Sequence, residues 1–302
     1  MRTLARALGR RALSSASSSV SAATSASAAT FPPPLYVTEA ASGRAVSAWH
    51  DVPLRSRGQP EAVLNFLCEI PRGAQPPKLE LDTAAPLNAI VQDRNKDGSP
   101  RRYRLDTLIH YGCLPRTYED PSHKDRWTGL LGDGDPVDVC DIAVGHAPAP
   151  QPGAMYRVKV LGALAMIDGG ETDWKILAVR ADDPLAAQVH DVADALRTPT
   201  AVLKLADAVR EWFRHYKVPE GKGENSFAFE GRWLGRDVAL EVVADTHAQY
   251  ARLLAAPRAA RPAKGAPWLP PSGWAPPADD FLQGDAARSA DLLAGTTTAA
   301  PR

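Results

Sequence analysis

Hydrophobic and polar residues alternate in the first half of the chain with the period of β-strands. In VLNFLCEI, residues 63–70, apolar side chains occupy every second position from Leu64 to Ile70, which predicts a half-buried strand. The runs MYRVKVLGALAMID (155–168) and DWKILAV (173–179) predict two more strands. Because only the tight turn GGET separates these two runs, we expect them to form a hairpin.

Further along the chain, apolar residues recur every three or four positions, which is the spacing of one helix face. This spacing predicts one helix over 202–216 and a second over 240–254. Their apolar faces consist of Val202, Leu205, Ala206, Val209, Trp212, Phe213 and Tyr216, and of Leu240, Val243, His247, Tyr250 and Leu254. We therefore expect a single domain from about 35 to 255 that opens with strands and closes with two helices.

The first thirty residues have the composition of a targeting sequence. Residues 1–30 hold several arginines, a run of serines and no acidic residue, and Arg2, Arg6 and Arg10 would share one face of a helix. We therefore predict an organelle transit peptide. The arginine spacing favours a mitochondrion, which we prefer, and the serine run favours a plastid. The alternative is a tail that carries no targeting signal, on a cytoplasmic protein.

The other end of the chain also departs from the domain. Residues 256–302 are rich in alanine, proline and glycine, a composition that buries too little apolar surface to fold alone, so we predict a surface tail. Trp268, Trp274 and Phe281 stand out in this segment. We expect these three aromatic side chains to pack against their own domain.

Composition narrows the class of protein. Of 302 residues, 44% are hydrophobic and 23% are charged, which is typical of a soluble globular protein, and no apolar run is long enough to span a bilayer. The formal net charge is zero, so bulk attraction to nucleic acid or to a membrane surface is not expected. The three cysteines lack CxxC spacing, which indicates neither a disulfide framework nor a thiolate zinc site.

Aspartates gather in LLGDGDPVDVCDI. Asp133 and Asp135 would share one face of an extended segment, and the bend at Pro136 would bring Asp138 towards them, with Asp141 following. Converging carboxylates repel one another, and hard divalent cations with oxygen ligands offset this repulsion at neutral pH. The segment therefore predicts a magnesium or calcium site.

A calcium loop of the EF-hand type fits neither acidic segment well. Counted from Asp133, Asp138 stands where the loop requires glycine. The segment DRNKDGSPRRYR, residues 93–104, matches the early positions of the loop but ends on Arg104 instead of the required glutamate. We interpret 93–104 as a polar turn.

A second polar cluster, IDGGETDWK, lies in the predicted hairpin. A strand would place Asp173 and Lys175 on one side, and Asp168 across the hairpin mouth. Taken singly, each acid is explained by a structural salt bridge; together with the first cluster, they predict a site with several metal ions that faces a phosphate. Cations and a tyrosine in two further segments, EIPRGAQPPKLE and WFRHYKVPEGKGEN, support phosphoryl chemistry. These segments contain Glu69, Arg72, Lys78, Glu80, Tyr216, Lys217 and Lys222.

The motifs EIPR(x)5KLE, YEDP, GDGDPVDVCDI, DGGETDWK and WFRHYKVPEGKGENSFAF resemble the soluble inorganic pyrophosphatases of family I in their eukaryotic form. The resemblance runs from about residue 36 to 254. It implies a mainly β fold with flanking helices (α+β), built on a closed, five-stranded, antiparallel, OB-like β-barrel, and often a homodimer. It also implies magnesium-dependent hydrolysis of pyrophosphate without a covalent intermediate.

The resemblance also implies roles for individual residues. About two to four magnesium ions would be held by acids, with Asp138 bridging two of them; the metal acids are Asp133, Asp138, Asp168, Asp173 and Glu80. Asp135 matches the carboxylate that takes a proton from the attacking water. The residues that match phosphate ligands are Lys78, Arg102, Lys175, Tyr216 and Lys217. Glu69 matches an acid that lines the cavity.

One segment departs from the family pattern. Arg102 and Tyr103 match an arginine and aromatic pair, but Tyr111 and Gly112 follow after a shorter stretch than is usual, and Thr107 takes the place of a tyrosine. Arg101 is the alternative phosphate ligand in this shortened loop. The deletion is either a real divergence or a mispredicted splice junction. A catalytically weakened or regulatory paralogue is the alternative function; an OB-fold module for nucleic acid is disfavoured because the region is acidic.

Overall fold

The computed structural model describes residues 31–39, 42–143, 149–197, 201–256, 267–271 and 273–274, without the side chains of 195–197 and 201–204. These residues belong to one compact unit that begins at Phe31. The predicted transit peptide and Phe281 lie outside the described residues, as does most of the predicted tail.

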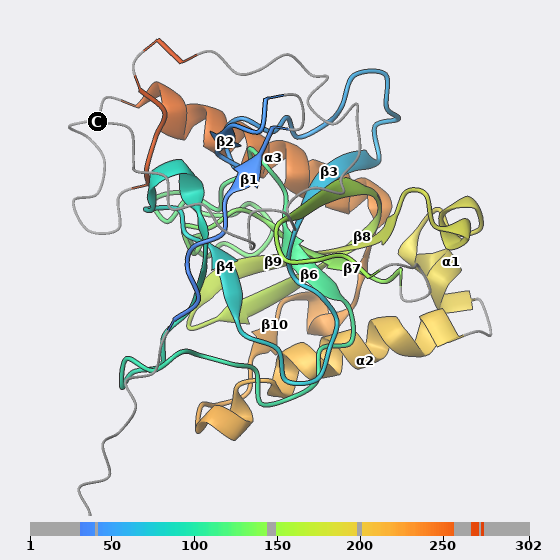
Figure 1. Ribbon diagram of the computed structural model, residues 1–302. Helices are drawn as coiled ribbons and strands as arrows, with labels where there is room; N and C mark the ends of the chain where they lie inside the picture. The colour runs from blue at the N-terminus through green and yellow to red at the C-terminus, as the bar shows by residue number, and fades with distance from the viewer. Residues whose placement is uncertain are drawn as a thin grey trace, which may run out of the picture. The chain divides into compact units, whose positions relative to one another are not determined.

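The main sheet has seven strands, of which the five longest carry most of the pairing (Figure 1). They are β3 (Val63–Ile70), β6 (His110–Cys113), β7 (Asp138–Asp141), β8 (Ala154–Asp168) and β9 (Glu171–Arg180). The pairs are β8 with β3, β3 with β6, β6 with β7, β7 with β9, and β9 with β8. Among these five strands, β8 pairs with β3 along its first half and with β9 along most of its length.

Shorter elements extend this sheet or cover it. Strands β10 (Ser226–Phe227) and β11 (Leu234–Gly235) pair with β8, while β1 (Val37–Thr38) pairs with β2 (Ala45–Val46), and β4 (Leu79–Leu81) pairs with β5 (Ile90–Gln92). The helices are α1 (Val192–Arg197), α2 (Ala201–His215) and α3 (Arg236–Ala255). Single 3-10 turns occupy Pro86–Asn88, Pro184–Ala187, Val218–Glu220 and Phe229–Gly231.

The predicted hairpin is confirmed as β8 and β9, which pair antiparallel from Asp168 and Glu171 outward. Its turn consists of Gly169 and Gly170, both at positive φ, where a side chain would strain the backbone. The two predicted helices are also confirmed as α2 and α3. The six-residue helix α1 was not predicted.

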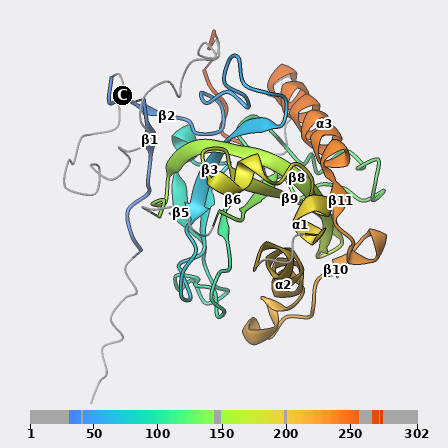
Figure 2. The same cartoon turned by 90° about the vertical axis from the view of Figure 1, so that its right-hand side faces the viewer.

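The long helices lie on opposite sides of the sheet, as both views show (Figures 1 and 2). Val242 and Val243 of α3 share a core with Phe66 of β3. Val209 and Phe213 of α2 belong to a second core, to which β3 contributes Leu67 and Ile70. The prediction that β3 is half-buried is therefore wrong, because packed layers cover both of its faces.

The prediction of a purely antiparallel sheet also needs correction. β7 and β9 pair parallel, with Asp138 opposite Lys175. The reason is that the chain reverses twice between them, once into β8 and once through the glycine turn, so β9 regains the direction of β7. In the part of the chain that the structure describes, no helix combines the length and apolar character needed to cross a bilayer.

Candidate active site

The loop before β7 presents its aspartates in a fixed conformation. Asp133 Oδ1 accepts a hydrogen bond from the backbone N–H of Asp135 at 3.0 Å. The loop lies so close to residue 119 that a Cβ on Gly132 would come within 2.3 Å of the Glu119 backbone, so only glycine fits there. Two of the predicted metal acids and the predicted proton acceptor, Asp135, are thus within one short segment.

The parallel register of β7 and β9 brings the two acidic clusters together. Lys175 is only 1% exposed, and its Nζ donates hydrogen bonds to Asp138 Oδ2 and to Asp173 Oδ1. The sequence prediction that Asp173 and Lys175 share one side of their strand is confirmed, since Trp174 and Ile176 point into the opposite core. Two aspartates from different strands therefore converge on one ammonium group.

A tyrosine from a third strand completes this group. The hydroxyl of Tyr111 on β6 donates a hydrogen bond to Asp138 Oδ2. Tyr111 served in the sequence only as a landmark of the shortened loop. In the sequence, only its position beside Gly112 in the HYG segment marked Tyr111 as a candidate site residue. The contact with Asp138 depends on the pairing of β6 with β7.

Three aspartates of the site have raised pKa values. Burial raises the pKa of Asp173 to about 6, and repulsion from Asp138 works against the attraction of Lys175. Asp135 is exposed at the surface, and desolvation by the protein around it, with repulsion from Glu80 and Asp138, raises its pKa to about 7. Burial and repulsion by Asp173 also raise the pKa of Asp133 well above its ordinary value. The cluster is short of positive charge.

The donor set fits a hard divalent cation. One carboxylate oxygen each from Glu119, Asp133 and Asp173 lies within 4.8 Å of the other two. Glu119 Oε2 is buried and has no hydrogen-bond partner in the structure. A bound cation would give this oxygen and its neighbours the counter-charge that the protein does not supply. Glu119 belongs to the YEDP motif and was not among the predicted site residues.

A second polar network surrounds Lys78. Its Nζ contacts Glu80 Oε2 and lies 3.1 Å from Asp93 Oδ2. Asp93 Oδ2 also lies 2.8 Å from Arg101, whose other guanidinium nitrogen contacts Glu220 at 2.8 Å. The polar turn expected at 93–104 is present, closed by a bridge between Arg94 and Pro100.

The two candidate arginines are placed differently. Arg101 is buried within the Lys78 network, whereas the side chain of Arg102 is exposed to solvent. Arg102 pairs only through its backbone, with Pro77. The structure therefore brings Arg101 rather than Arg102 together with Lys78.

The end of α2 supplies the residues on the far side of the site. Lys217 Nζ contacts Asp168 Oδ2 at the hairpin mouth. Tyr216 is buried and stacks on Trp212, with ring centroids 4.9 Å apart. Burial raises the pKa of Tyr216 far above its ordinary value, and the charges of Asp173 and Asp168 act in the same direction. The Tyr216 hydroxyl is therefore a neutral hydrogen-bond donor at neutral pH.

Glu69 on β3 lies close enough to Asp138 for the two carboxyl groups to interact electrostatically. It is 4% exposed, and its Oε1 accepts a hydrogen bond from Leu81 N–H at 2.7 Å. Burial, with repulsion from Asp138, raises the pKa of Glu69 to about 8. This carboxyl group is therefore protonated at neutral pH in the metal-free protein.

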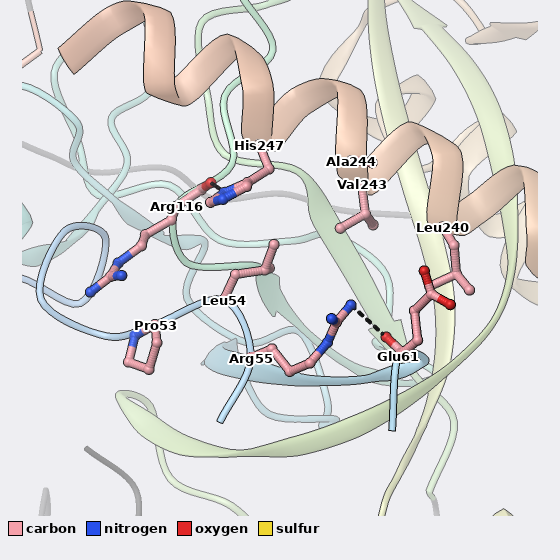
Figure 3. A pocket seen from close by; sticks show the side chains of 9 residues that line it. All are labelled: Pro53, Leu54, Arg55, Glu61, Arg116, Leu240, Val243, Ala244 and His247. Atoms are coloured by element: carbon pink, nitrogen blue, oxygen red, sulfur yellow. Dashed lines mark hydrogen bonds between the residues drawn. The ribbon is translucent and has the colours of Figure 1, made fainter. Parts of the chain in front are cut away.

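A separate pocket lies between the start of the domain and α3 (Figure 3). It has a volume of about 310 Å³, and its lining includes Leu54, Arg55, Glu61 and His247. His247 Nδ1 lies 2.6 Å from the carbonyl oxygen of Arg116, and Arg55 donates to the carbonyl oxygen of Glu61 at 2.9 Å. None of the predicted metal acids lines this pocket, so it is distinct from the acidic site.

Comparisons with known proteins identify one family. A family model described as inorganic pyrophosphatase matches residues 66–251. The soluble inorganic pyrophosphatase 1, chloroplastic, of Chlamydomonas reinhardtii is 42% identical over 71% of this chain and 72% of its own. The inorganic pyrophosphatase of Mus musculus is 41% identical over 70% of this chain and 71% of its own.

Solved structures give the same result. The inorganic pyrophosphatase of Schistosoma japonicum aligns with a TM-score of 0.67 and 36% identity, over 73% of this chain and 76% of that one. The type I inorganic pyrophosphatase of Toxoplasma gondii aligns with a TM-score of 0.66 and 38% identity, over 74% of this chain and 98% of that one.

Proposed function

The chain belongs to the inorganic pyrophosphatase family and hydrolyses inorganic pyrophosphate to two phosphates, and we propose that it does so with magnesium ions bound by Asp133, Asp138 and Asp173. The observation that carries this proposal is the parallel register of β7 and β9, which sets Asp138 beside Lys175 and Asp173. Acids from two strands and a buried ammonium group then face the same point. Bound magnesium supplies a water of lowered pKa and neutralises charge on the phosphates.

The proton of the attacking water passes to Asp135. Its pKa of about 7 in the metal-free protein reflects desolvation and the negative charges around it, and positive charge in the site shifts that pKa downwards, towards the ionised form that accepts a proton. The water attacks one phosphorus atom, the bridging P–O bond breaks, and the second phosphate leaves with the electron pair.

The cations around the acids hold the substrate. Lys78 and Arg101 on one side, and Lys217 with the Tyr216 hydroxyl on the other, bind phosphate oxygens, and Lys175 stabilises charge at the centre. In the metal-free structure Lys78 and Lys217 are paired with Glu80 and Asp168. Glu80 and Asp168 are then the acids available for further magnesium ions, to a total of about two to four.

The surrounding assembly is also proposed. The ring of strand pairs through β3, β6, β7, β9 and β8 supports a closed five-stranded barrel with one parallel pair. We propose a homodimer, from the resemblance to the eukaryotic form, and import into an organelle, from the composition of residues 1–30. The algal relative is named chloroplastic, which favours a plastid, whereas the arginine spacing favours a mitochondrion.

The experiment is phosphate release from pyrophosphate by the purified protein as magnesium is titrated from zero. We expect phosphate release to require magnesium. We expect Asp138→Asn to lose this activity, because the change removes the negative charge of a proposed magnesium ligand. The matched control is Asp207→Asn, an exposed acid on α2 whose side chain pairs with Arg210. Near-normal turnover in Asp138→Asn would reject the metal assignment.

A further inference from the structure

The acidic site includes a carboxylate beyond the predicted set. We propose that Glu119 is a direct ligand of the divalent cation that binds at Asp133 and Asp173. The inference rests on the proposed function in that it needs a cation at this site, and it adds a ligand from a segment that carries none of the predicted metal acids.

The backbone of Glu119 is fixed to the loop that carries Asp133. Its N–H donates to the carbonyl oxygen of Asp135 at 2.9 Å, and its carbonyl oxygen accepts from Gly134 N–H at 2.8 Å. The close approach of Gly132 to the same residue leaves no room for a side chain. Glu119 and Asp133 therefore keep a constant separation, as a preorganised ligand pair requires.

The side chain is fixed at one oxygen only. Glu119 is 2% exposed, and its Oε1 accepts a hydrogen bond from the N–H of Trp174 at 3.0 Å. Its Oε2 is buried and has no partner. Buried carboxylate oxygens are almost always paired, because an unpaired one loses its hydration without compensation.

The position of the Glu119 carboxylate indicates that a divalent cation binds its unpaired oxygen. It lies beside Asp133 and Asp173, with one oxygen from each of the three residues within 4.8 Å of the others. The ammonium of Lys175 is engaged by Asp173 and Asp138. After small movements of the side chains, three oxygens at these separations can all lie about 2.0–2.6 Å from one central ion. This is the range of magnesium–oxygen and calcium–oxygen bond lengths.

A purely structural role is the competing explanation. In that case Glu119 serves only to accept the hydrogen bond from Trp174 and so braces β9 against the loop. The variant Glu119→Gln separates the two explanations, because the amide oxygen still accepts that hydrogen bond while the charge is lost.

The first experiment measures Mn²⁺ binding to the purified full-length protein without pyrophosphate, by the EPR signal of free Mn²⁺. The proteins are wild type, Glu119→Gln, Asp138→Asn and the control Glu241→Gln, an exposed acid on α3. We expect Glu119→Gln to weaken binding by more than about 10–100-fold, which is the loss caused by removing a residue that only supports a ligand, and the control to bind as wild type does. Wild-type affinity in Glu119→Gln together with weakened binding in Asp138→Asn would overturn the inference and leave the proposed function intact.

Absence of Mn²⁺ binding by the wild type would reject the metal site itself and the inference with it. A second measurement uses only the wild-type protein, so its result does not depend on whether a variant folds. Anomalous scattering from wild-type crystals soaked in Mn²⁺ should show a peak about 2.0–2.6 Å from a carboxylate oxygen of Glu119. A peak bound by Asp133 and Asp173 but beyond that distance from Glu119 would overturn the inference.

Discussion

Asp138 receives hydrogen bonds from side chains on two other strands, the ammonium of Lys175 and the hydroxyl of Tyr111. Strand alternation was enough to predict that Lys175 and Asp173 share a side, because that pattern is local in the sequence. The contact between Asp138 and Lys175 joins positions 37 residues apart and depends on strand register, which local periodicity does not encode. For the same reason Tyr111 and Glu119 were missed.

Glu69 gives a prediction for pH dependence. Its pKa of about 8 in the folded protein lies above the value of about 4.3 in an unfolded chain. Between these values the folded state keeps the proton and the unfolded state loses it, so this group makes the protein less stable as pH rises through that range. In Glu69→Gln the free energy of unfolding should fall less steeply, by up to about 1.4 kcal/mol per pH unit.

The measurement is urea unfolding of both proteins in EDTA, at intervals from about pH 5 to pH 8. Glutamine keeps an oxygen that can accept the hydrogen bond from Leu81, so the fold itself is retained. Parallel curves for the two proteins would show that Glu69 is already ionised at the lower pH.

At the scale of elements, the loop at residues 101–112 is fixed by hydrogen bonds to two other segments. Thr107 Oγ1 accepts a hydrogen bond from Gly73 N–H at 2.9 Å, and Trp212 of α2 donates to the carbonyl oxygen of Asp106 at 2.9 Å. Gly73 lies in the segment that leads to Lys78. The threonine in the place of the family tyrosine therefore ties two segments of the site together.

Thr107→Val keeps the shape of this buried side chain and removes its hydroxyl. We expect stability to fall by about 1–3 kcal/mol, because Gly73 N–H loses its acceptor. The KM for pyrophosphate should rise, since the Lys78 segment is less constrained. Thr107→Ser is the matched control, and chemical denaturation with steady-state kinetics measures both effects. Equal behaviour of the valine and serine variants would contradict this role.

Element prediction succeeded where a pattern was long. The hairpin and the helices α2 and α3 extend over many residues, so their periods of two and 3.6 are clear. The six residues of α1 complete fewer than two turns, and the two-residue strands β10 and β11 have no period at all. Their formation depends on what they pack against.

At the scale of the whole molecule, the predicted docking of two tail aromatics is confirmed. The ring of Trp268 lies 5.9 Å from that of His50, its backbone N–H donates to the carbonyl oxygen of Thr83 at 2.7 Å, and Trp274 Nε1 donates to Asp51 at 2.8 Å. The carbonyl oxygen of Trp268 lies 2.9 Å from His50 Nε2. The described part of the tail thus covers the start of the domain, far along the chain from it.

A chain that ends at residue 256 should therefore unfold at a lower temperature than the full chain, by roughly 5 °C or more, because it loses several hydrogen bonds and the apolar contacts of the tail. A chain that ends at residue 274 keeps them and is the control. Calorimetry of the three forms measures the difference. Equal melting temperatures would mean that the contacts of Trp268 and Trp274 add nothing to stability.

Lys175 gives the metal-free protein its own counter-ion. Its ammonium group stands between Asp138 and Asp173 and is attached to the strand that carries one of them. Many small metal-binding domains, by contrast, stay unfolded until their metal binds. Here a tethered cation offsets part of the repulsion between the carboxylates, so we expect the chain to fold before magnesium binds.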